Sequence, residues 1–296
     1  MPSLVLSKTT QKRWKRRLMP TVHFSYGLRN SIYSALERKA IRAYWYQENN
    51  FGDRITPDLL RYYGLKPIFS PNFEACQVAA VGSILEILPD AFDGTILGSG
   101  FINSETTKQF SSAKIALVRG YLTAEKFSMP IDFPVGDPGI LVDRLYQRAI
   151  ITTRKKYTLG LVPHYRHASH PAVHKLVEKY PDEIALIDVR QSPKQVSCDI
   201  AACRHIASSS LHGIVVAHSL NIPVVPIKIE VVSLRGGTFK FEDYFSAYDK
   251  SPLFHTLSGT EVLRELCSLT TAMAPNLVDR VKQTVHTAFL ENLRDL

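Results

Sequence analysis

The chain has 296 residues, of which 45% are hydrophobic and 21% are charged. These proportions are ordinary for a globular protein, and the length favours two domains that each bury a core. No apolar run approaches the ~18 residues that span a bilayer, and the start lacks the apolar stretch of a signal peptide, so we expect a cytoplasmic protein. The cysteines at 76, 198, 203 and 267 lack metal or redox spacing, which predicts free thiols.

The net charge of +9 favours anionic partners. Part of the excess lies in a basic N-terminal extension, residues 1–20, where Trp14 stands among Lys8, Lys12, Arg13, Lys15, Arg16 and Arg17. Such a segment suits peripheral contact with an anionic membrane on its inner face, at about 1 kcal/mol per cation. The alternative is a solvated chain end. No RNA-binding signature accompanies the segment, so we do not expect nucleic acid as a partner.

The first half of the chain shows short apolar runs that stop at glycine loops. We predict a strand at 43–46, a polar loop at 47–53, and a helix at 56–63 with Thr56 as its N-cap and Gly64 after its end. Further strands are predicted at 77–81, 94–97 and 114–118. Strands of this kind, separated by helix-length segments, indicate a parallel sheet whose ligands bind at the carboxyl ends of the strands.

After a charged link at 152–156 the pattern starts again. We predict strands at 157–162, 184–189, 206–208 and 222–229, and helices at 170–180, 196–205 and 211–220. Ser258 and Glu261 suit a capping box, and apolar residues from Val278 to Leu293 share one helical face. The expected fold class is therefore α/β, with two Rossmann-like domains, 1–152 and 153–296, in a GT-B-like arrangement with a C-terminal helical segment.

Several segments, taken in order, resemble the polysaccharide pyruvyl transferase family. They are Asn50-Phe51-Gly52-Asp53, Gly98-Ser99-Gly100, Val118-Arg119-Gly120, Gly136-Asp137-Pro138, Val162-Pro163-His164-Tyr165, and Ser208-Ser209-Ser210-Leu211-His212-Gly213 followed by Asn221-Ile222-Pro223. The resemblance covers roughly residues 43–250. It implies a GT-B-like fold and transfer of a pyruvyl group from phosphoenolpyruvate to a sugar of a bacterial capsule, exopolysaccharide or lipid-linked precursor. The product is a pyruvate ketal, and no cofactor is expected beyond the phosphoenolpyruvate co-substrate.

The sequence departs from the family pattern at two places. Ser210 stands where members often carry arginine, and the first glycine-rich loop is reduced to Gly82-Ser83. A contact with the donor anion at position 210 must therefore come from elsewhere or be absent. Loss of the arginine also leaves open a non-catalytic binding protein on the same scaffold.

Two residues are the candidates for catalysis. Pyruvyl transfer requires a proton for the methylene carbon of phosphoenolpyruvate, and histidine is suited to supply it near neutral pH. His212 follows a serine-rich helix entry, where free backbone N–H groups bind anions. Asp53, in the loop after the first strand, would bind or deprotonate an acceptor hydroxyl; the alternative is a turn or capping aspartate.

The remaining candidates divide between donor and acceptor. Arg119 ends a strand, where it would grip a carboxylate or phosphate, unless it forms a surface ion pair. The expected donor-binding residues are Arg119, His164, Arg166, Ser208, Ser209, Ser210, Leu211 and Gly213. Possible acceptor-side residues are Asn50, Gly52, Gly98, Ser99, Gly100 and Asp137, although Asp137 also suits a capping role.

Two other interpretations were weighed. The histidines at 164, 167, 170 and 174 invite a metal site, but no cysteine or carboxylate completes a ligand set, so we expect none. A GT-B glycosyltransferase that uses a nucleotide sugar is the alternative function. Glu242 or Asp243 would then bind the ribose, although the segment 239–248 is more typical of an aromatic, acidic packing loop.

Overall fold

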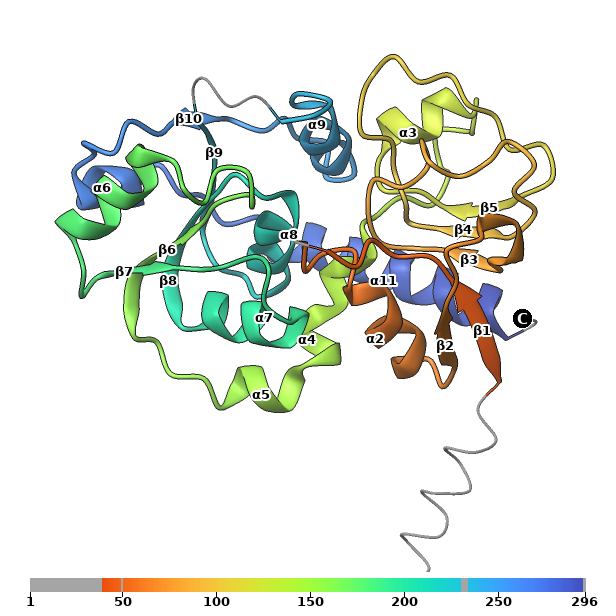
Figure 1. Cartoon of the computed structure of the whole chain (residues 1–296), viewed down its shortest axis with the longest axis horizontal. Helices are drawn as coiled ribbons and strands as arrows, with labels where there is room; N and C mark the ends of the chain where they lie inside the picture. The colour runs from red at the N-terminus through yellow and green to blue at the C-terminus, as the bar shows by residue number, and fades with distance from the viewer. Residues whose placement is uncertain (1–38, 49, 230–233, 295–296) are drawn as a thin grey trace, which may run out of the picture.

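The computed structural model describes residues 39–48, 50–229 and 234–294. The basic N-terminal extension lies outside these residues, so its predicted membrane contact stays a prediction. Two five-stranded sheets, both parallel, form the framework. In Figure 1 the first sheet lies on the right and the second on the left, with helix α8 between them. The predicted α/β class is therefore confirmed.

The first sheet has the strand order β2-β1-β3-β4-β5. Its strands are β1 (Ala40–Ala43), β2 (Lys66–Phe69), β3 (Val78–Ala79), β4 (Thr95–Leu97) and β5 (Lys114–Leu117). The other elements of this half are α2 (Ile55–Tyr62), η1 (Phe73–Ala75), α3 (Tyr121–Lys126), η2 (Pro138–Leu141), α4 (Val142–Leu145) and α5 (Gln147–Ile151). Because all the strands run the same way, their carboxyl ends converge on the side that faces the second sheet.

The second sheet has the strand order β10-β9-β8-β6-β7. Its strands are β6 (Tyr157–Val162), β7 (Ile184–Leu186), β8 (Cys203–Ser208), β9 (Val224–Lys228) and β10 (His255–Thr256). The helices are α6 (Pro171–Lys179), α7 (Pro193–Ala201), α8 (Leu211–Ser219), α9 (Phe239–Ser246), α10 (Leu263–Ser268) and α11 (Pro275–Leu293). The chain passes from one sheet to the other through α4 and α5, as Figure 1 shows.

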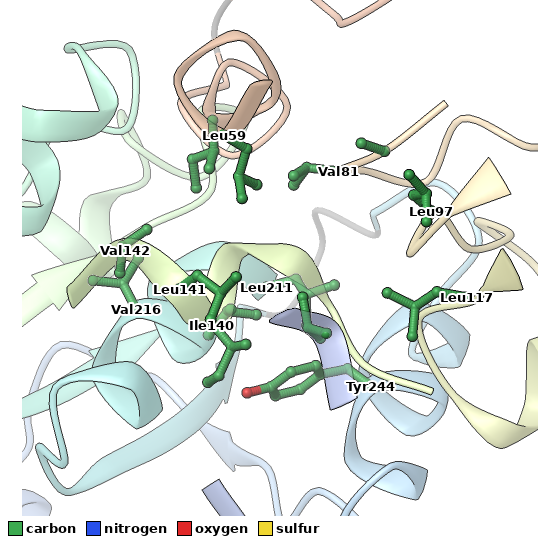
Figure 2. Close-up of a cluster of buried hydrophobic side chains, with 14 of the residues drawn as sticks. Leu59, Val81, Leu97, Leu117, Ile140, Leu141, Val142, Leu211, Val216 and Tyr244 are labelled. Carbon is green, nitrogen blue, oxygen red and sulfur yellow. The ribbon is translucent and has the colours of Figure 1, made fainter. Parts of the chain in front are cut away.

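One hydrophobic core joins the first half of the chain, up to α5, and the second half, from β6 onward. Figure 2 shows Leu59, Val81 and Leu97 from the first half close to Leu211 and Val216 of α8. Ile140, Leu141 and Val142 belong to the same cluster, and each is fully buried. All nine residues of α8 are buried, because the helix has the second sheet on one side and the first half on the other. The structure therefore fixes the first turn of α8 against the first half of the chain.

Several predicted elements differ from the observed ones. The strand predicted at 43–46 lies earlier, as β1, because Ala40–Ala43 pairs with β2. Helix α2 begins at Ile55, and Thr56 lies inside it, where its Oγ1 accepts from the Val81 amide. Gly64 follows the helix with a φ of 84°, as expected of the residue that ends a helix. The short strand predicted at 206–208 begins at Cys203, so the predicted helix 196–205 ends early, at Ala201.

Two segments near the C-terminal end of the chain also differ. The segment 239–248, expected as a loop, forms α9, which packs against α3 of the first half. The Ser258–Glu261 pair closes a turn on itself, and α10 starts later, after Val262. Helix α11 buries the predicted apolar face, including Val278 and Phe289, and it contacts β4 and β5 of the first sheet. The predicted domain limits remain a prediction.

Candidate functional site

A cavity of about 360 Å³ lies between the two halves, beside the first turn of α8. The first half contributes the loop around Asp53 and the Gly82-Ser83 turn, and the second half contributes the end of β6 and the start of α8. The lining residues are Tyr44, Tyr46, Asn50, Asp53, Ser83, Ile84, Ile87, Ile102, His164, Tyr165, Arg166, Ser210, Leu211, His212, Leu234, Arg235 and Lys240. This is the place where a parallel sheet binds ligands, at the carboxyl ends of its strands.

The loop that carries Asp53 is held from both halves of the molecule. Phe51 is fully buried, and its amide donates to the Val189 carbonyl across the interface at 2.9 Å. Asn50 accepts from the Gly52 amide and donates from Nδ2 to Asp53 Oδ2. The Asp53 carbonyl accepts from the amide of Thr56 in the first turn of α2. The Asp53 carboxylate is therefore positioned by its own loop and by the helix that follows.

Glycines make room for the two candidate catalytic side chains. A Cβ on Gly52 would overlap the imidazole ring of His212, and a Cβ on Gly82 would overlap the Asp53 carboxylate. Gly82 also has a φ of 117°, which disfavours any other residue. Both residues therefore allow the backbone of the first half to approach the site closely.

Burial raises the pKa of the Asp53 carboxyl to about 6. The charges of His212 and Lys240 and a backbone hydrogen bond oppose this shift, while Asp137 adds to it. A carboxyl group with this pKa is mostly ionised at pH 7 and is still basic enough to accept a proton.

His212 lies on α8, lines the same cavity as Asp53 and faces a second carboxylate. Its Nε2 is 3.5 Å from Oδ2 of Asp137, which is fully buried. The other Asp137 oxygen, Oδ1, accepts from the Gly139 amide at 2.8 Å, so the predicted capping role of Asp137 is confirmed. Asp137 does not line the cavity. It contacts His212 at Nε2.

The cations around the cavity are not paired alike. Lys240 is 9% exposed, and within the described part of the chain no carboxylate oxygen lies within 4 Å of its Nζ. Burial, and then the nearby charge of Arg119, lower its pKa to about 8, while Asp53 opposes this shift. Arg166 and Arg235 add positive charge at the rim. Such a cavity favours an anionic ligand.

Arg119 does not line the cavity. Its side chain is fully buried, and its Nε donates to Asp243 Oδ2 at 2.8 Å. Its Nη atoms donate to Ser83 Oγ and to the Phe101 carbonyl. The guanidinium group therefore joins the first half to α9. The ion pair is buried, so the surface ion pair weighed as an alternative is wrong.

The serine-rich segment before α8 is divided between the cavity and the interior. Ser210 and Leu211 line the cavity at the start of the helix. The Ser208 Oγ donates to the Val162 carbonyl, and the Ser209 Oγ accepts from the His164 amide and pairs with His167 Nδ1. Gly213 packs against Ser208. These contacts fix the end of β6, which carries His164 and Arg166, relative to the start of α8.

The predicted acceptor-side residues Gly98, Ser99 and Gly100 are not part of the cavity lining. Ser99 is fully buried and donates to the Ala80 carbonyl, and Gly100 lies against the Arg119 guanidinium group. Gly98 packs against Pro138. The Gly98-Ser99-Gly100 turn therefore packs against Pro138 and Arg119 and does not line the cavity.

Two of the histidines considered for a metal site lie in defined surroundings. His170 caps α6 by accepting from the Ala172 amide, and burial next to Lys240 lowers the pKa of His164 to about 3. Among the described residues no group of three or more His, Cys, Asp or Glu side chains converges as a metal site. In the same part of the chain no helix is both long and apolar enough to cross a membrane.

Sequence reasoning missed Lys240, Arg235 and the tyrosines at 44 and 46. Tyr44 and Tyr46 follow β1, which ends at Ala43, whereas the predicted strand 43–46 places them inside the sheet. Lys240 was hidden because the segment 239–248 was expected to be a packing loop. A lysine between two phenylalanines in an apolar stretch was the available signal, since lysine is rarely buried unless it is paired.

The fold and the site define an α/β protein with two parallel sheets and a cationic cavity between them, which is lined by the Asp53 carboxylate and by a buried histidine that faces a second carboxylate. Comparison with known proteins assigns this chain to a family: residues 24–230 match the polysaccharide pyruvyl transferase family, and the chain belongs to it. The match covers the segments on which the resemblance was based, from Asn50 to Pro223.

Two curated relatives match parts of the chain. One is the succinoglycan biosynthesis protein ExoV of Rhizobium meliloti (strain 1021), 30% identical over 209 residues, which are 68% of this chain and 62% of the relative. The other is an uncharacterized protein of Acanthamoeba polyphaga mimivirus, 30% identical over 159 residues, which are 52% of this chain and 54% of the relative. The aligned part of the chain thus spans less than two thirds of each relative.

Proposed function

We propose that the protein transfers the enolpyruvyl group of phosphoenolpyruvate to a sugar of a polysaccharide or of its lipid-linked precursor, forming a pyruvate ketal. The observation that carries the proposal is the cavity itself, which the His212 imidazole and the Asp53 carboxylate line together with Lys240, a buried cation that has no carboxylate oxygen within 4 Å among the described residues. Family membership and the polysaccharide role in the name of the Rhizobium relative support it. The proposal requires no resident cofactor.

The donor has two anionic groups, a phosphate and a carboxylate, and the cavity offers matching positive charge. Lys240 lies deep in it, Arg166 and Arg235 lie at its rim, and Ser210 and Leu211 place the start of α8 against it. A buried cation attracts an anion more strongly than an exposed one because little water screens it. Lys240 thus supplies the cation that position 210 lacks.

The reaction would proceed by proton transfer and addition. His212 delivers a proton to the methylene carbon of phosphoenolpyruvate, and a sugar hydroxyl adds to the adjacent carbon while Asp53 takes the hydroxyl proton. The C–O bond to phosphate then breaks, inorganic phosphate leaves, and the second hydroxyl adds to the same carbon and gives its proton to the departing phosphate, which closes the ketal. The buried start of α8 and the cations stabilise the leaving phosphate.

The acceptor side of the cavity is aromatic. Tyr46 and Tyr165 are partly exposed at 40% and 36%, and Tyr44 lies beside Asp53. Aromatic side chains of this kind provide apolar faces with a polar tip, which suits a sugar ring. We propose that the acceptor sugar rests on them, with the hydroxyl pair turned toward Asp53.

The glycosyltransferase alternative gains no support from the geometry. Asp243, one of the two residues considered for a ribose contact, is fully buried and accepts from Arg119, from the Thr123 amide and from Thr123 Oγ1. Its oxygens are therefore occupied. A GT-B-like arrangement of the two halves remains part of the proposal.

Phosphate release from phosphoenolpyruvate, measured with a panel of galactosides, glucosides and mannosamine glycosides, tests the function. We expect release that depends on one class of sugar and that falls ~10²–10⁴-fold in His212→Ala. His174→Ala, on the exposed side of α6, is the matched control and should keep the rate. A folded protein that neither releases phosphate with any sugar nor binds phosphoenolpyruvate would contradict the proposal.

A further inference from the structure

The pairing of His212 with Asp137 has a consequence for which ring nitrogen reacts. Asp137 Oδ2 and His212 Nε2 face each other at 3.5 Å, and both atoms are buried. Neither has a hydrogen-bond partner elsewhere in the described residues. Asp137 Oδ1 is fixed by the Gly139 amide, so Oδ2 is directed at the imidazole by the η2 turn.

Two unpartnered buried polar atoms that face each other are costly unless they share a proton. A carboxylate accepts only, so the favourable arrangement places the histidine proton on Nε2, pointing at Asp137. The ring has little room to turn, because the Gly52 backbone approaches its Nδ1–Cγ–Cε1 side so closely that a Cβ there would overlap it, and a Cβ on Gly139 would lie 3.5 Å from its Cδ2. His212 nevertheless lines the cavity. Since Nε2 is sealed against Asp137, Nδ1 is the nitrogen that remains for a ligand.

We infer that Asp137 is a positioning residue that holds the proton of neutral His212 on Nε2, so that Nδ1 exchanges the proton with the substrate. This inference rests on the proposed function for its catalytic part, but the tautomer itself does not. When Nδ1 gains the proton that it will deliver, the imidazolium ion has Asp137 at Nε2, and the charge of Asp53 also acts on the ring. Asp137 keeps its charge throughout and takes no part in bond making.

Asp137→Asn separates positioning from folding. Asparagine keeps an oxygen for the Gly139 amide, but it directs an NH₂ donor at Nε2, which then must accept and forces the proton onto Nδ1. Nitrogen chemical shifts of isotopically labelled histidine, with His212 assigned from the spectrum of His212→Gln, report the tautomer directly. We expect the Nε2–H form in the wild-type protein and the Nδ1–H form in Asp137→Asn.

The kinetic readout follows from the same change. If the pyruvyl transferase activity is present, Asp137→Asn should lower kcat on the order of 10³-fold or more, as for an orienting aspartate elsewhere, with phosphoenolpyruvate binding within a few-fold. An unchanged tautomer in Asp137→Asn, or an Nδ1–H tautomer in the wild type, would overturn the inference. A correct tautomer shift without any phosphate release in the wild type would instead contradict the proposed function alone.

Thermal unfolding guards against a merely structural effect. Asp137→Asn should unfold within a few degrees of the wild type, because the cap on η2 survives. Asp137→Ala removes the cap as well and should unfold at a lower temperature than Asp137→Asn. If Asp137→Asn and Asp137→Ala lost the same stability and the same activity, the role of Asp137 would be structural and the inference would fail.

Discussion

Two buried cations, Arg119 and Lys240, differ in whether other side chains pair with them. Arg119, at the end of β5, donates to Asp243, Ser83 and Phe101. Lys240, on α9 three residues before Asp243, has no carboxylate within 4 Å in the described residues, and it lines the cavity. The difference in pairing indicates whether a buried cation has a structural or a ligand-binding role. A cation surrounded by acceptors holds the structure together, whereas one left without an acceptor beside a cavity is available to a ligand.

The comparison also explains why α9 matters. The Arg119–Asp243 pair, with the two contacts from Thr123, fixes α9 to the first half. Lys240 is thereby held at a set place, although the helix belongs to the second half in sequence. Arg119 therefore helps to position Lys240 at the cavity.

Breaking the Arg119 pair should have the largest effect on stability. Arg119→Met leaves Asp243 buried without its cation, and we expect a loss of about 3–5 kcal/mol in the free energy of unfolding. Urea unfolding measures it. The double variant Arg119→Met/Asp243→Asn removes the stranded charge and keeps an acceptor for Thr123, so it should recover most of the loss. A double variant as unstable as the single one would refute this account.

The charge of Asp53 acts on Lys240, and removing it tests Asp53 as the base. We expect Asp53→Asn to lower the rate of sugar-dependent phosphate release by ~10²–10⁴-fold. In the wild type kcat/KM should fall as the pH drops below about 6, where Asp53 becomes protonated, and this limb should vanish in the variant. Rates measured from pH 4.5 to 8 decide the point, and an unchanged acid limb in the variant would assign it to another group.

The raised pKa of Asp53 also predicts a stability difference. The folded protein holds the Asp53 proton up to about pH 6, whereas the unfolded chain releases it near 3.8. The stability contributed by the protonated group is therefore present below pH 3.8 and is lost as the pH rises through 6. The wild type should lose stability relative to Asp53→Asn across this window, as measured by chemical unfolding at each pH.

Lys240→Met should separate binding from stability. We expect the Kd for phosphoenolpyruvate to rise ~10–100-fold, the loss of one charge-assisted contact, while the free energy of unfolding at pH 7 stays the same or increases. Calorimetric titration and urea unfolding give the two values. Lys194→Met, which removes an exposed lysine of α7, is the control for net charge. If Lys240→Met destabilised the fold as Arg119→Met does, the contrast between the two cations would fail.

The smallest effect is a pH dependence of donor affinity. The phosphate of the donor is mostly ionised above ~pH 7, so a change in Kd from pH 7 to 9.5 reports on the protein. Lys240 loses its proton near pH 8 in the free protein, and affinity should decrease above that pH. In Lys240→Met the affinity should be flat over the same range. A similar decrease in both proteins would point to another cation.

Local patterns in the sequence predict much of the parallel-sheet architecture. The glycine-ended apolar runs predicted parallel strands, and β6 was predicted to the residue at 157–162. The sequence predicts His212 at the entry of a helix and Asp53 in the loop after a strand. In the structure both residues line one cavity. These results depend on local patterns, namely strand period, helix entry and turn residues, which a single sequence displays.

What the sequence does not reveal depends on contacts between distant segments. Nothing in Val118-Arg119-Gly120 shows that the arginine pairs with a residue 124 positions later. Asp137 appeared as a cap, which it is, but its second oxygen faces His212 only because η2 packs against α8. Lys240 could not be assigned to the cavity before α9 was known to be a helix docked on α3.

Helix α11 has a consequence for how the protein matures as it is synthesised. It is built from residues 275–293, yet it covers β4 and β5, whose residues emerge from the ribosome more than 150 positions earlier. Until α11 arrives, the apolar surface that Val278, Val285 and Phe289 cover stays open to water. The first sheet therefore cannot complete its core ahead of the second, and the nascent first half is a natural client for chaperones that shield apolar surface.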